Sequence, residues 1–212
     1  MSILTGIVKR LRGSALVPTA DELRREVSEA YGRAASRPWG RHCFPVGRAF
    51  ALNVGYPPSL LSAIPRAAVR SFAGVSNVSV FAEIPEGSRV LDLGCGAGLD
   101  VIVASRRTGP RGQVTAVDFS ARMARAARMA VARAGCSNVT VVEGAAEEIP
   151  LPDGSVDVAL ANGIFNLNPH RERIFSELFR VLAPGGSAWV AELVLVRPMQ
   201  ETGPCSMRDW FA

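Results

Sequence analysis

Three glycines spaced two residues apart follow an apolar run that contains a single carboxylate. The segment is VLDLGCGAGLD (90–100). An apolar strand that ends in glycines and continues into a helix predicts a tight turn, at which the backbone can approach a ligand at the helix N-terminus. Such ligands bind at the carboxyl ends of parallel strands. The chemistry that this segment predicts is therefore binding of a small molecule by a backbone turn.

Two carboxylates narrow the choice of ligand. Leu99 stands where the third glycine of the dinucleotide motif belongs, and no Gly-Lys-Ser/Thr follows for a P-loop. Asp92, two residues before the first glycine, suits a positively charged amino group better than a pyrophosphate. Asp118 ends the next apolar run, where a carboxylate can accept hydrogen bonds from both hydroxyls of a ribose. A ribose with an amino-acid tail and no phosphate indicates S-adenosylmethionine (SAM).

The elements that position these residues alternate after residue 85. The pattern predicts strands over 89–93, 113–117, 138–142, 156–161 and 188–196. Helices are predicted over 100–107, between Ser120 and Gly135, and from Pro169 to Pro184. Short apolar strands separated by helices indicate an α/β fold, in which helices cover both faces of a parallel sheet.

The first 84 residues are predicted to be helical. Thr19 and Glu22 form a capping-box pattern, and the apolar residues of the following helix share one face. Shorter helices are predicted near 47–54, 59–63 and 65–72. Met1–Val17 reads as an amphipathic docking helix, with a membrane-surface anchor as the alternative. We therefore divide the chain into an N-terminal helical cap or lid segment (1–84) and a SAM-binding core (85–212).

The core resembles a known family. Residues 88–196 are similar to class I SAM-dependent methyltransferases in four segments: VLDLGCGAGLD (90–100), VTAVDFS (114–120), VEGAAEEIPLPDGSVDVALANG (142–163) and FRVLAPGG (179–186). The segments NLNP (166–169) and AGVSN (73–77), with the helical region around Tyr31, are similar to the branch of ubiquinone/menaquinone C-methyltransferases and arsenite methyltransferases. The resemblance implies a Rossmann-like, mostly parallel sheet, SAM as the cofactor, and methyl transfer to a small-molecule acceptor.

The resemblance also implies which residues bind SAM. The glycines would pass under its methionine part, Asp92 would lie near its amino group, and Asp118 would bind its ribose. Phe119 or Met123 would pack on the adenine, and the backbone amide of Ala146 would serve the adenine ring. Asn162 would line the mouth of the site. The full set of expected cofactor-binding residues is Asp92, Gly94, Cys95, Gly96, Gly98, Asp118, Phe119, Met123, Ala145, Ala146 and Asn162.

Three departures from the family pattern bear on function. Family members often carry a carboxylate for the adenine amine where this chain has Ala145, and Glu147 or a backbone carbonyl is the expected substitute. Val75 and Gly163 stand where arsenite methyltransferases are expected to carry thiolates, so arsenite would require the non-standard thiols Cys43 or Cys205. The sequence NGIF (162–165) is not the Asn-Pro-Pro-aromatic motif of base methylation.

Two other classes of function stay open beside methyl transfer. One is a non-catalytic SAM-binding module, and the other is an oxidoreductase with a nucleotide cofactor, which Leu99 disfavours. The only histidines, His42 and His170, are candidate bases, but the pattern assigns no catalytic residue. No cysteine pair has C-x-x-C spacing, so we expect no metal site.

Net charge and hydropathy limit the classes of partner that we expect for this chain. The net charge of +5 comes almost entirely from scattered arginines, since Lys9 is the only lysine, so we expect no nucleic-acid partner. No apolar run reaches the roughly 18–20 residues of a membrane span, and we expect no integral membrane segment. Four cysteines without a signal peptide predict reduced thiols and a cytoplasmic location.

The length of 212 residues gives the last expectation. Sheets of this family usually have seven strands and the pattern here predicts five, so we expect the C-terminal strands to be missing and the chain to be a fragment. The fifth strand would then be an apolar edge strand, which is a pairing hazard. The alternative is that a second copy of the chain covers this edge in a homodimer.

Overall fold

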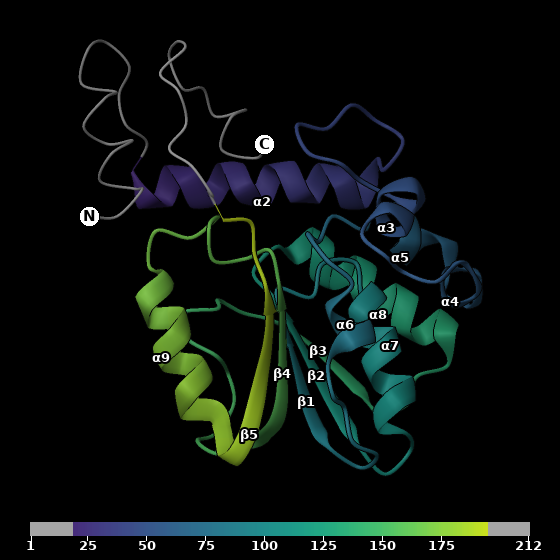
Figure 1. The fold of residues 1–212 in the computed structure, drawn as a ribbon. Helices are drawn as coiled ribbons and strands as arrows, with labels where there is room; N and C mark the ends of the chain where they lie inside the picture. Colours follow the sequence, from purple (N-terminus) through teal and green to yellow (C-terminus); the bar gives the residue numbers. More distant parts are fainter. Residues whose placement is uncertain (1–18, 195–212) are drawn as a thin grey trace.

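The computed structural model describes residues 19–194, and their centre is a five-stranded sheet whose strands are all parallel (Figure 1). The sheet order is β3-β2-β1-β4-β5. The strands are β1 (Arg89–Leu93), β2 (Gln113–Asp118), β3 (Val139–Glu143), β4 (Val156–Asn162) and β5 (Leu182–Ala191). The predicted α/β, Rossmann-like fold is thus confirmed. The expected helix over Met1–Val17, and Cys205, lie outside the described residues.

Helices cover both faces of this sheet. On one face, α7 (Leu99–Thr108) and α8 (Ala121–Ala134) pack on the sheet together with the short α6 (Val78–Phe81), and their buried residues share one apolar cluster. On the other face, α9 (Arg171–Val181) buries Ile174, Leu178 and Val181 against β1 and β4. Parallel strands buried on both faces need largely apolar sequences, which β1, β2 and β4 have. No helix within residues 19–194 combines the length and the apolar character needed to cross a bilayer.

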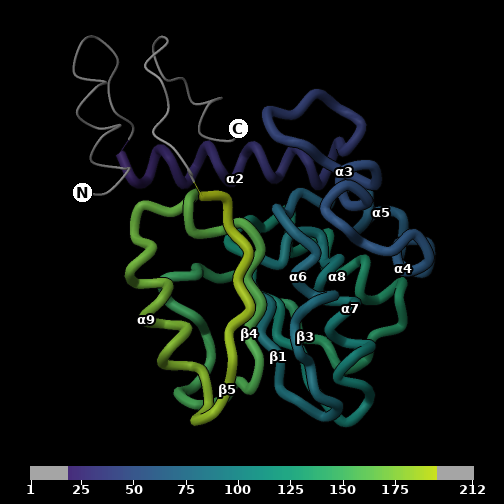
Figure 2. Tube along the Cα trace, in the orientation of Figure 1, coloured from purple at the N-terminus to yellow at the C-terminus, as the bar shows by residue number. Residues whose placement is uncertain are grey.

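The N-terminal helices lie over one end and one side of this core (Figure 2). Helix α2 (Ala20–Ser36) crosses the carboxyl ends of the strands, where its residues line the same pocket as the loops that follow β1, β2 and β4. Three short helices follow it: α3 (Arg48–Asn53), α4 (Pro58–Ala63) and α5 (Arg66–Arg70). Buried residues of α3 to α6 belong to the same apolar cluster as α7 and α8. The sequence-based boundary at residue 84 falls between α6 and β1.

Local sequence explains where α2 and α8 begin and end. The Thr19 hydroxyl accepts a hydrogen bond from the Glu22 amide at 3.2 Å, and the Glu22 carboxylate accepts one from the Thr19 amide at 2.7 Å. The predicted capping box is therefore present. Gly135 ends α8 with φ of 69°, a conformation that favours glycine.

Three elements differ from the sequence-based predictions. Helix α9 begins at Arg171 instead of Pro169, because the Asn168 side chain accepts a hydrogen bond from the His170 amide at 2.8 Å and closes a separate turn. Strand β5 begins at Leu182 instead of residue 188, because the chain pairs with β4 across an irregular register at Val156 and Val158. Helix α6 has four residues and no periodic pattern, and the sequence did not predict it.

Candidate functional site

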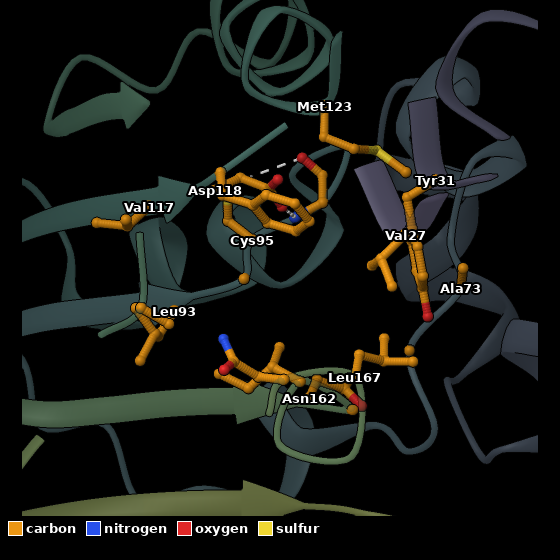
Figure 3. A pocket seen from close by; sticks show the side chains of 18 of the residues that line it. Val27, Tyr31, Ala73, Leu93, Cys95, Val117, Asp118, Met123, Asn162 and Leu167 are labelled. Carbon is orange, nitrogen blue, oxygen red and sulfur yellow. Dashed lines mark hydrogen bonds between the residues drawn. The ribbon is translucent and has the colours of Figure 1, made fainter. Parts of the chain in front are cut away.

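A pocket lies at the carboxyl ends of β1, β2 and β4, beneath α2 (Figure 3). It contains about 1200 Å³, including the part that is open to solvent. In Figure 3, Leu93 and Val117 lie on the side of the sheet, and Val27 and Tyr31 of α2 face them across the pocket. A pocket at the strand ends of an open parallel sheet is the expected place for a small ligand.

The glycine turn (residues 94–98) forms the floor of this pocket. The amides of Gly94 and Cys95 both donate to the Val117 carbonyl, at 2.8 and 3.0 Å, so the turn is fixed to the end of β2. Gly94, Gly96 and Gly98 have φ of 74°, 53° and 88°, a region that other residues rarely adopt. A Cβ atom on Gly94 would collide with the Cγ2 atom of Ile164. Gly94, Cys95 and Gly96 line the pocket, whereas Gly98 packs against Ala127 of α8.

Asp118 stands beside the turn at the end of β2. One carboxylate oxygen accepts a hydrogen bond from the Gly96 amide at 2.8 Å, and the other accepts one from the Ser120 amide at 2.8 Å. The side chain is buried but lines the pocket, and its oxygens keep lone pairs for two further donors. Burial raises the pKa of Asp118 to about 6, and the two amides lower it in part. This geometry suits two hydroxyl donors on neighbouring carbons.

Asp92 lies within β1, behind the turn, and is not part of the pocket surface. Its Oδ2 atom is buried and has no hydrogen-bond partner among the described residues. Burial raises the pKa of Asp92 well above its ordinary value, and the neighbouring carboxylates Asp100 and Asp118 raise it further. An unpartnered buried acceptor next to two other carboxylates favours a positive group close by.

Asp100, in the first turn of α7, joins the N-terminal helices to the core. Its Oδ1 atom accepts hydrogen bonds from the hydroxyls of Tyr56 and Ser79, and its Oδ2 atom accepts one from the Asn162 amide at 3.0 Å. Burial raises the pKa of Asp100, whereas the hydrogen bonds from Ser79, Tyr56 and Asn162 lower it. The sequence predicted Asp100 only as the start of a helix, because its partners lie 21 to 62 positions away.

Asn162 lines the pocket as expected, but its polar atoms serve the protein. Its Oδ1 atom accepts hydrogen bonds from the amides of Val75 and Ser76 at 2.8 and 3.1 Å. Its Nδ2 atom donates to the Ser76 carbonyl at 2.7 Å and to Asp100. An amide side chain offers two donors and two acceptor sites, so this residue fixes the segment before α6 to the end of β4.

The four residues expected around the adenine separate into two groups. Phe119, Met123 and Ala146 line the pocket together with Gly144 and Glu147. Met123 is also packed among Ala34 and Ala97, so its contact with a ligand would be through one edge. Ala145 lines a separate shallow depression with Glu148 and Ile149, away from the pocket.

The α2 wall of the pocket was not predicted as part of the site. It consists of Ala20, Asp21, Arg24, Val27 and Tyr31. The Tyr31 ring stacks on Phe44 at 4.5 Å between centroids, and burial raises the pKa of its hydroxyl. The apolar face of this helix was visible in the sequence as a packing surface, but the sequence carries no signal for what it packs against.

Among the described residues, one cysteine and one histidine line the pocket. Of the cysteines within residues 19–194, only Cys95 lines it, and burial, Asp118 and Asp92 all raise the pKa of its thiol. His170 is exposed and lies at the rim of the pocket. His42 does not line the pocket, and its Nε2 atom is hydrogen-bonded to the Arg37 carbonyl at 3.0 Å. In the described part of the chain, no three His, Cys, Asp or Glu side chains are grouped as a metal site requires.

The residues present fit SAM. The amides and open backbone of the glycine turn allow close approach of its methionine part, and Asp118 offers lone pairs to its ribose hydroxyls. The buried, unpartnered Oδ2 atom of Asp92, behind the turn, favours a positive group close by, which the amino group of SAM would supply. Phe119 supplies an aromatic face one residue beyond Asp118, where a base attached to that ribose would lie.

Comparisons with known proteins agree with this geometry. A family model described as a methyltransferase domain matches residues 90–186. The chain is 38% identical over 128 residues to an arsenite methyltransferase from Halobacterium salinarum, an alignment that covers 60% of this chain and 33% of the relative. It is 38% identical over 104 residues to a demethylmenaquinone methyltransferase from Listeria monocytogenes, covering 49% of this chain and 44% of the relative.

A solved structure shares the fold. The arsenic(III) S-adenosylmethionine methyltransferase from Chlamydomonas reinhardtii aligns with a TM-score of 0.57 and 36% identity, covering 63% of this chain and 48% of that one. The chain thus spans between a third and a half of the length of these relatives. Residues 90–186 are therefore similar to a methyltransferase domain, and the solved relative that shares this fold is named as an S-adenosylmethionine methyltransferase.

Proposed function

We propose that this protein transfers a methyl group from SAM to a small, largely apolar acceptor. The observation that carries the proposal is that one pocket contains both the glycine turn with Asp118 and an apolar region. That region lies under α2 and is lined by Val27, Ala68, Phe72, Ile164 and Leu167. An acceptor in it would be adjacent to the cofactor and shielded from water.

The chemistry divides between the cofactor and the chain. Bound SAM supplies a methyl group on a positive sulfonium, which makes that methyl strongly electrophilic. The glycine turn, Asp92 and Asp118 would hold the cofactor at both ends, and the α2 wall would orient the acceptor and exclude water. Such orientation is worth about 7–11 kcal/mol in a two-reactant step. We assign no base, since His170, the only histidine of the described residues on this pocket, is exposed at its rim.

The cysteines within residues 19–194 argue against a trivalent arsenic acceptor. Binding arsenic needs several soft thiolates at one place. Val75 and Gly163 contact each other, because a Cβ atom on Gly163 would lie 3.0 Å from Val75 Cγ1, so an apolar contact occupies the place where thiolates were expected. Cys43 does not line the pocket, and burial keeps Cys95 a thiol. Between the acceptors that the names of the two relatives give, these side chains therefore favour the demethylmenaquinone type over arsenite for this chain.

The test is a transfer assay with SAM labelled in its methyl group. Acceptors are quinols and phenols of increasing apolar size, with arsenite plus thiol as the comparison. We expect label in an apolar quinol or phenol and none in arsenite. Binding of SAM without transfer to any acceptor would instead support the non-catalytic SAM-binding module.

Two further sequence-based expectations stay predictions. A homodimer through the edge strand β5 is one, and Val190 on that strand is 40% exposed. Analytical ultracentrifugation would measure it, with Val190→Lys as the variant that prevents pairing. The cytoplasmic location is the other, and cell fractionation would measure it.

A further inference from the structure

The charges of this chain are distributed unevenly along it. Residues 37–82 contain five arginines and neither aspartate nor glutamate, so their formal charge of +5 equals that of the whole chain. All other residues together therefore carry no net charge. The segment includes α3, α4 and α5, which lie on one side of the core, and all five arginines are exposed (Figure 1). The net positive charge of the protein is thus presented by this one segment.

The fold brings three of these arginines to one place. The Gly47 amide donates a hydrogen bond to the Phe72 carbonyl at 2.8 Å, which holds the start of α3 beside the end of α5. Arg48 of α3 and Arg66 and Arg70 of α5 line the same open depression, which is separate from the pocket at the strand ends. We call these three residues the arginine cluster.

Within residues 19–194, no carboxylate forms an ion pair with the arginine cluster. The Nη2 atom of Arg48 contacts uncharged oxygens, the Ser62 hydroxyl at 3.3 Å and the Pro58 carbonyl at 3.5 Å. Arg106 of α7 adds a fourth cation next to the cluster, since its Nη2 atom donates to the Ala63 carbonyl of α4 at 2.9 Å. Grouped cations without paired anions favour an anionic partner.

The apolar side chains around the cluster indicate the class of that partner. The depression has an aliphatic floor of Leu61, Ile64 and Val69. The large apolar side chain that α3 to α5 expose is also aliphatic, Leu52, at 38%. Nucleic acids bind to surfaces that combine cations with aromatic rings on which bases stack. Arginines with exposed aliphatic groups instead suit the boundary between phospholipid headgroups and acyl chains.

We propose that the arginine cluster and the exposed face of α3 to α5 bind the surface of a bilayer that contains anionic phospholipids. Each arginine near such a surface strengthens binding by about fivefold. Helix α5 adjoins both sites, since Ala68 lines the pocket and Val69 lines the depression. The inference does not rest on the proposed function, because this binding needs neither SAM nor an acceptor.

The experiment measures sedimentation of the 212-residue protein with vesicles. One set contains equal parts of phosphatidylcholine and phosphatidylglycerol, and the other contains phosphatidylcholine alone. The cluster variant combines Arg48→Gln, Arg66→Gln and Arg70→Gln. The matched control removes the same charge from exposed positions on α2, before β2 and on α9, through Arg25→Gln, Arg111→Gln and Arg173→Gln. Thermal melts confirm that each variant is folded.

We expect the wild-type protein to bind the anionic vesicles, to leave the neutral ones unbound, and to dissociate as the salt concentration rises. The cluster variant should bind roughly 100-fold more weakly, because three arginines each contribute about fivefold. The control should change the affinity by less than about threefold, since its charges lie elsewhere. Replacing the cluster by three lysines keeps the charge and should preserve binding.

A second variant keeps the test valid if the cluster variant does not fold. Arg66→Gln with Arg70→Gln removes two side chains that take part in no hydrogen bond or ion pair within the described residues. This variant should weaken binding to the anionic vesicles by roughly 25-fold.

Three results would overturn the inference. One is absence of binding to anionic vesicles at low salt. Another is an equal effect of the cluster variant and the control, which would place the membrane contact elsewhere in the chain. The last is binding of single-stranded RNA, lost in the cluster variant, without binding of vesicles, which would assign the cluster to nucleic acid. None of these results bears on methyl transfer, which its own assay tests.

Discussion

The glycine turn and helix α2 face each other across one pocket, but different interactions hold them in place. The turn is fixed by backbone hydrogen bonds to β2 and by three glycines with positive φ. Helix α2 is held by side chains, among them the stacking of Tyr31 on Phe44 and the contact of Arg24 with Glu147. The comparison indicates that substitutions in the turn should have large effects and that substitutions in α2 should have small, graded ones.

The largest effect is expected from Gly94→Ala. A residue with φ of 74° that also collides with Ile164 combines backbone strain with overpacking, which together cost about 2–5 kcal/mol. Urea unfolding should show this loss, and calorimetry should show that S-adenosylhomocysteine no longer binds. Gly135→Ala is the matched control, because Gly135 has φ of 69° and nothing within 4 Å of an added Cβ. Its loss should be the smaller of the two, and equal losses would show that Ile164 does not restrict the turn.

The next largest effect is expected from the titration of Asp118, which makes the free energy of unfolding depend on pH. Its folded pKa of about 6 lies above the ordinary value of about 3.9, so the folded state holds the proton to higher pH. The contribution of Asp118 to the free energy of unfolding is therefore complete below about pH 4 and falls by up to about 3 kcal/mol as pH rises to about 6. Asp92 and Asp100, whose pKa values are also raised, add to this slope.

Binding should depend on pH in the opposite direction. Ribose hydroxyls donate to an ionised carboxylate, so the affinity for S-adenosylhomocysteine should increase as pH rises through about 6. In Asp118→Asn the fall of stability with pH should be shallower, and the affinity should lose most of its pH dependence. Urea unfolding between about pH 4 and 8 measures the first, and calorimetry over the same range measures the second. If stability and affinity changed with pH in the same way in the wild type and the variant, Asp118 would not be the group that titrates at this site.

Tyr56→Phe tests the connection between the N-terminal helices and the turn. The substitution removes a donor to the buried Asp100 carboxylate, which should cost about 1.5–3 kcal/mol of unfolding free energy. Hydrogen exchange should increase in α3 to α6 more than in the strands. Ser62→Ala is the control, since it removes an exposed hydroxyl of α4 that donates to the Pro58 carbonyl and accepts from Arg48, and it should change stability very little. A loss as large in the control would contradict a special role for the Asp100 network.

The smallest effect is expected from Thr19→Ala at the start of α2. Loss of a capping hydroxyl costs about 1 kcal/mol of helix stability. We expect faster hydrogen exchange in the first turns of α2 and little change in the glycine turn. Ser36→Ala, which removes a hydroxyl bonded to the Gly32 carbonyl at the other end of α2, should leave the first turns unchanged. If Thr19→Ala increased hydrogen exchange in the glycine turn as much as in the first turns of α2, the turn and α2 would not be held independently.

The same contrast explains what the sequence could predict. The strands, the glycine turn, Asp118 and the capping box of α2 were predicted, because each depends on residues close together in the chain. The start of β5 and of α9 could not be predicted, since the first depends on the irregular pairing with β4 and the second on one side-chain turn at Asn168.

The missed parts of the site depend on contacts between distant segments. Asp100 meets Tyr56, Ser79 and Asn162 only in the folded chain, and Arg24 meets Glu147 only because α2 crosses the strand ends. The sequence offers Glu147 as a substitute for the carboxylate absent at Ala145, but nothing in the sequence distinguishes it from Glu148. The structure distinguishes them by direction, since only Glu147 lines the pocket.

The central claim is that this pocket binds SAM through the glycine turn and Asp118. The most direct measurement is a calorimetric titration of the 212-residue protein with SAM, with NAD as the comparison ligand and Asp118→Ala as the variant. The account predicts micromolar binding of SAM, no binding of NAD, and at least roughly tenfold weaker SAM binding in the variant. Absence of both heat and a thermal shift with SAM at millimolar concentration would contradict it.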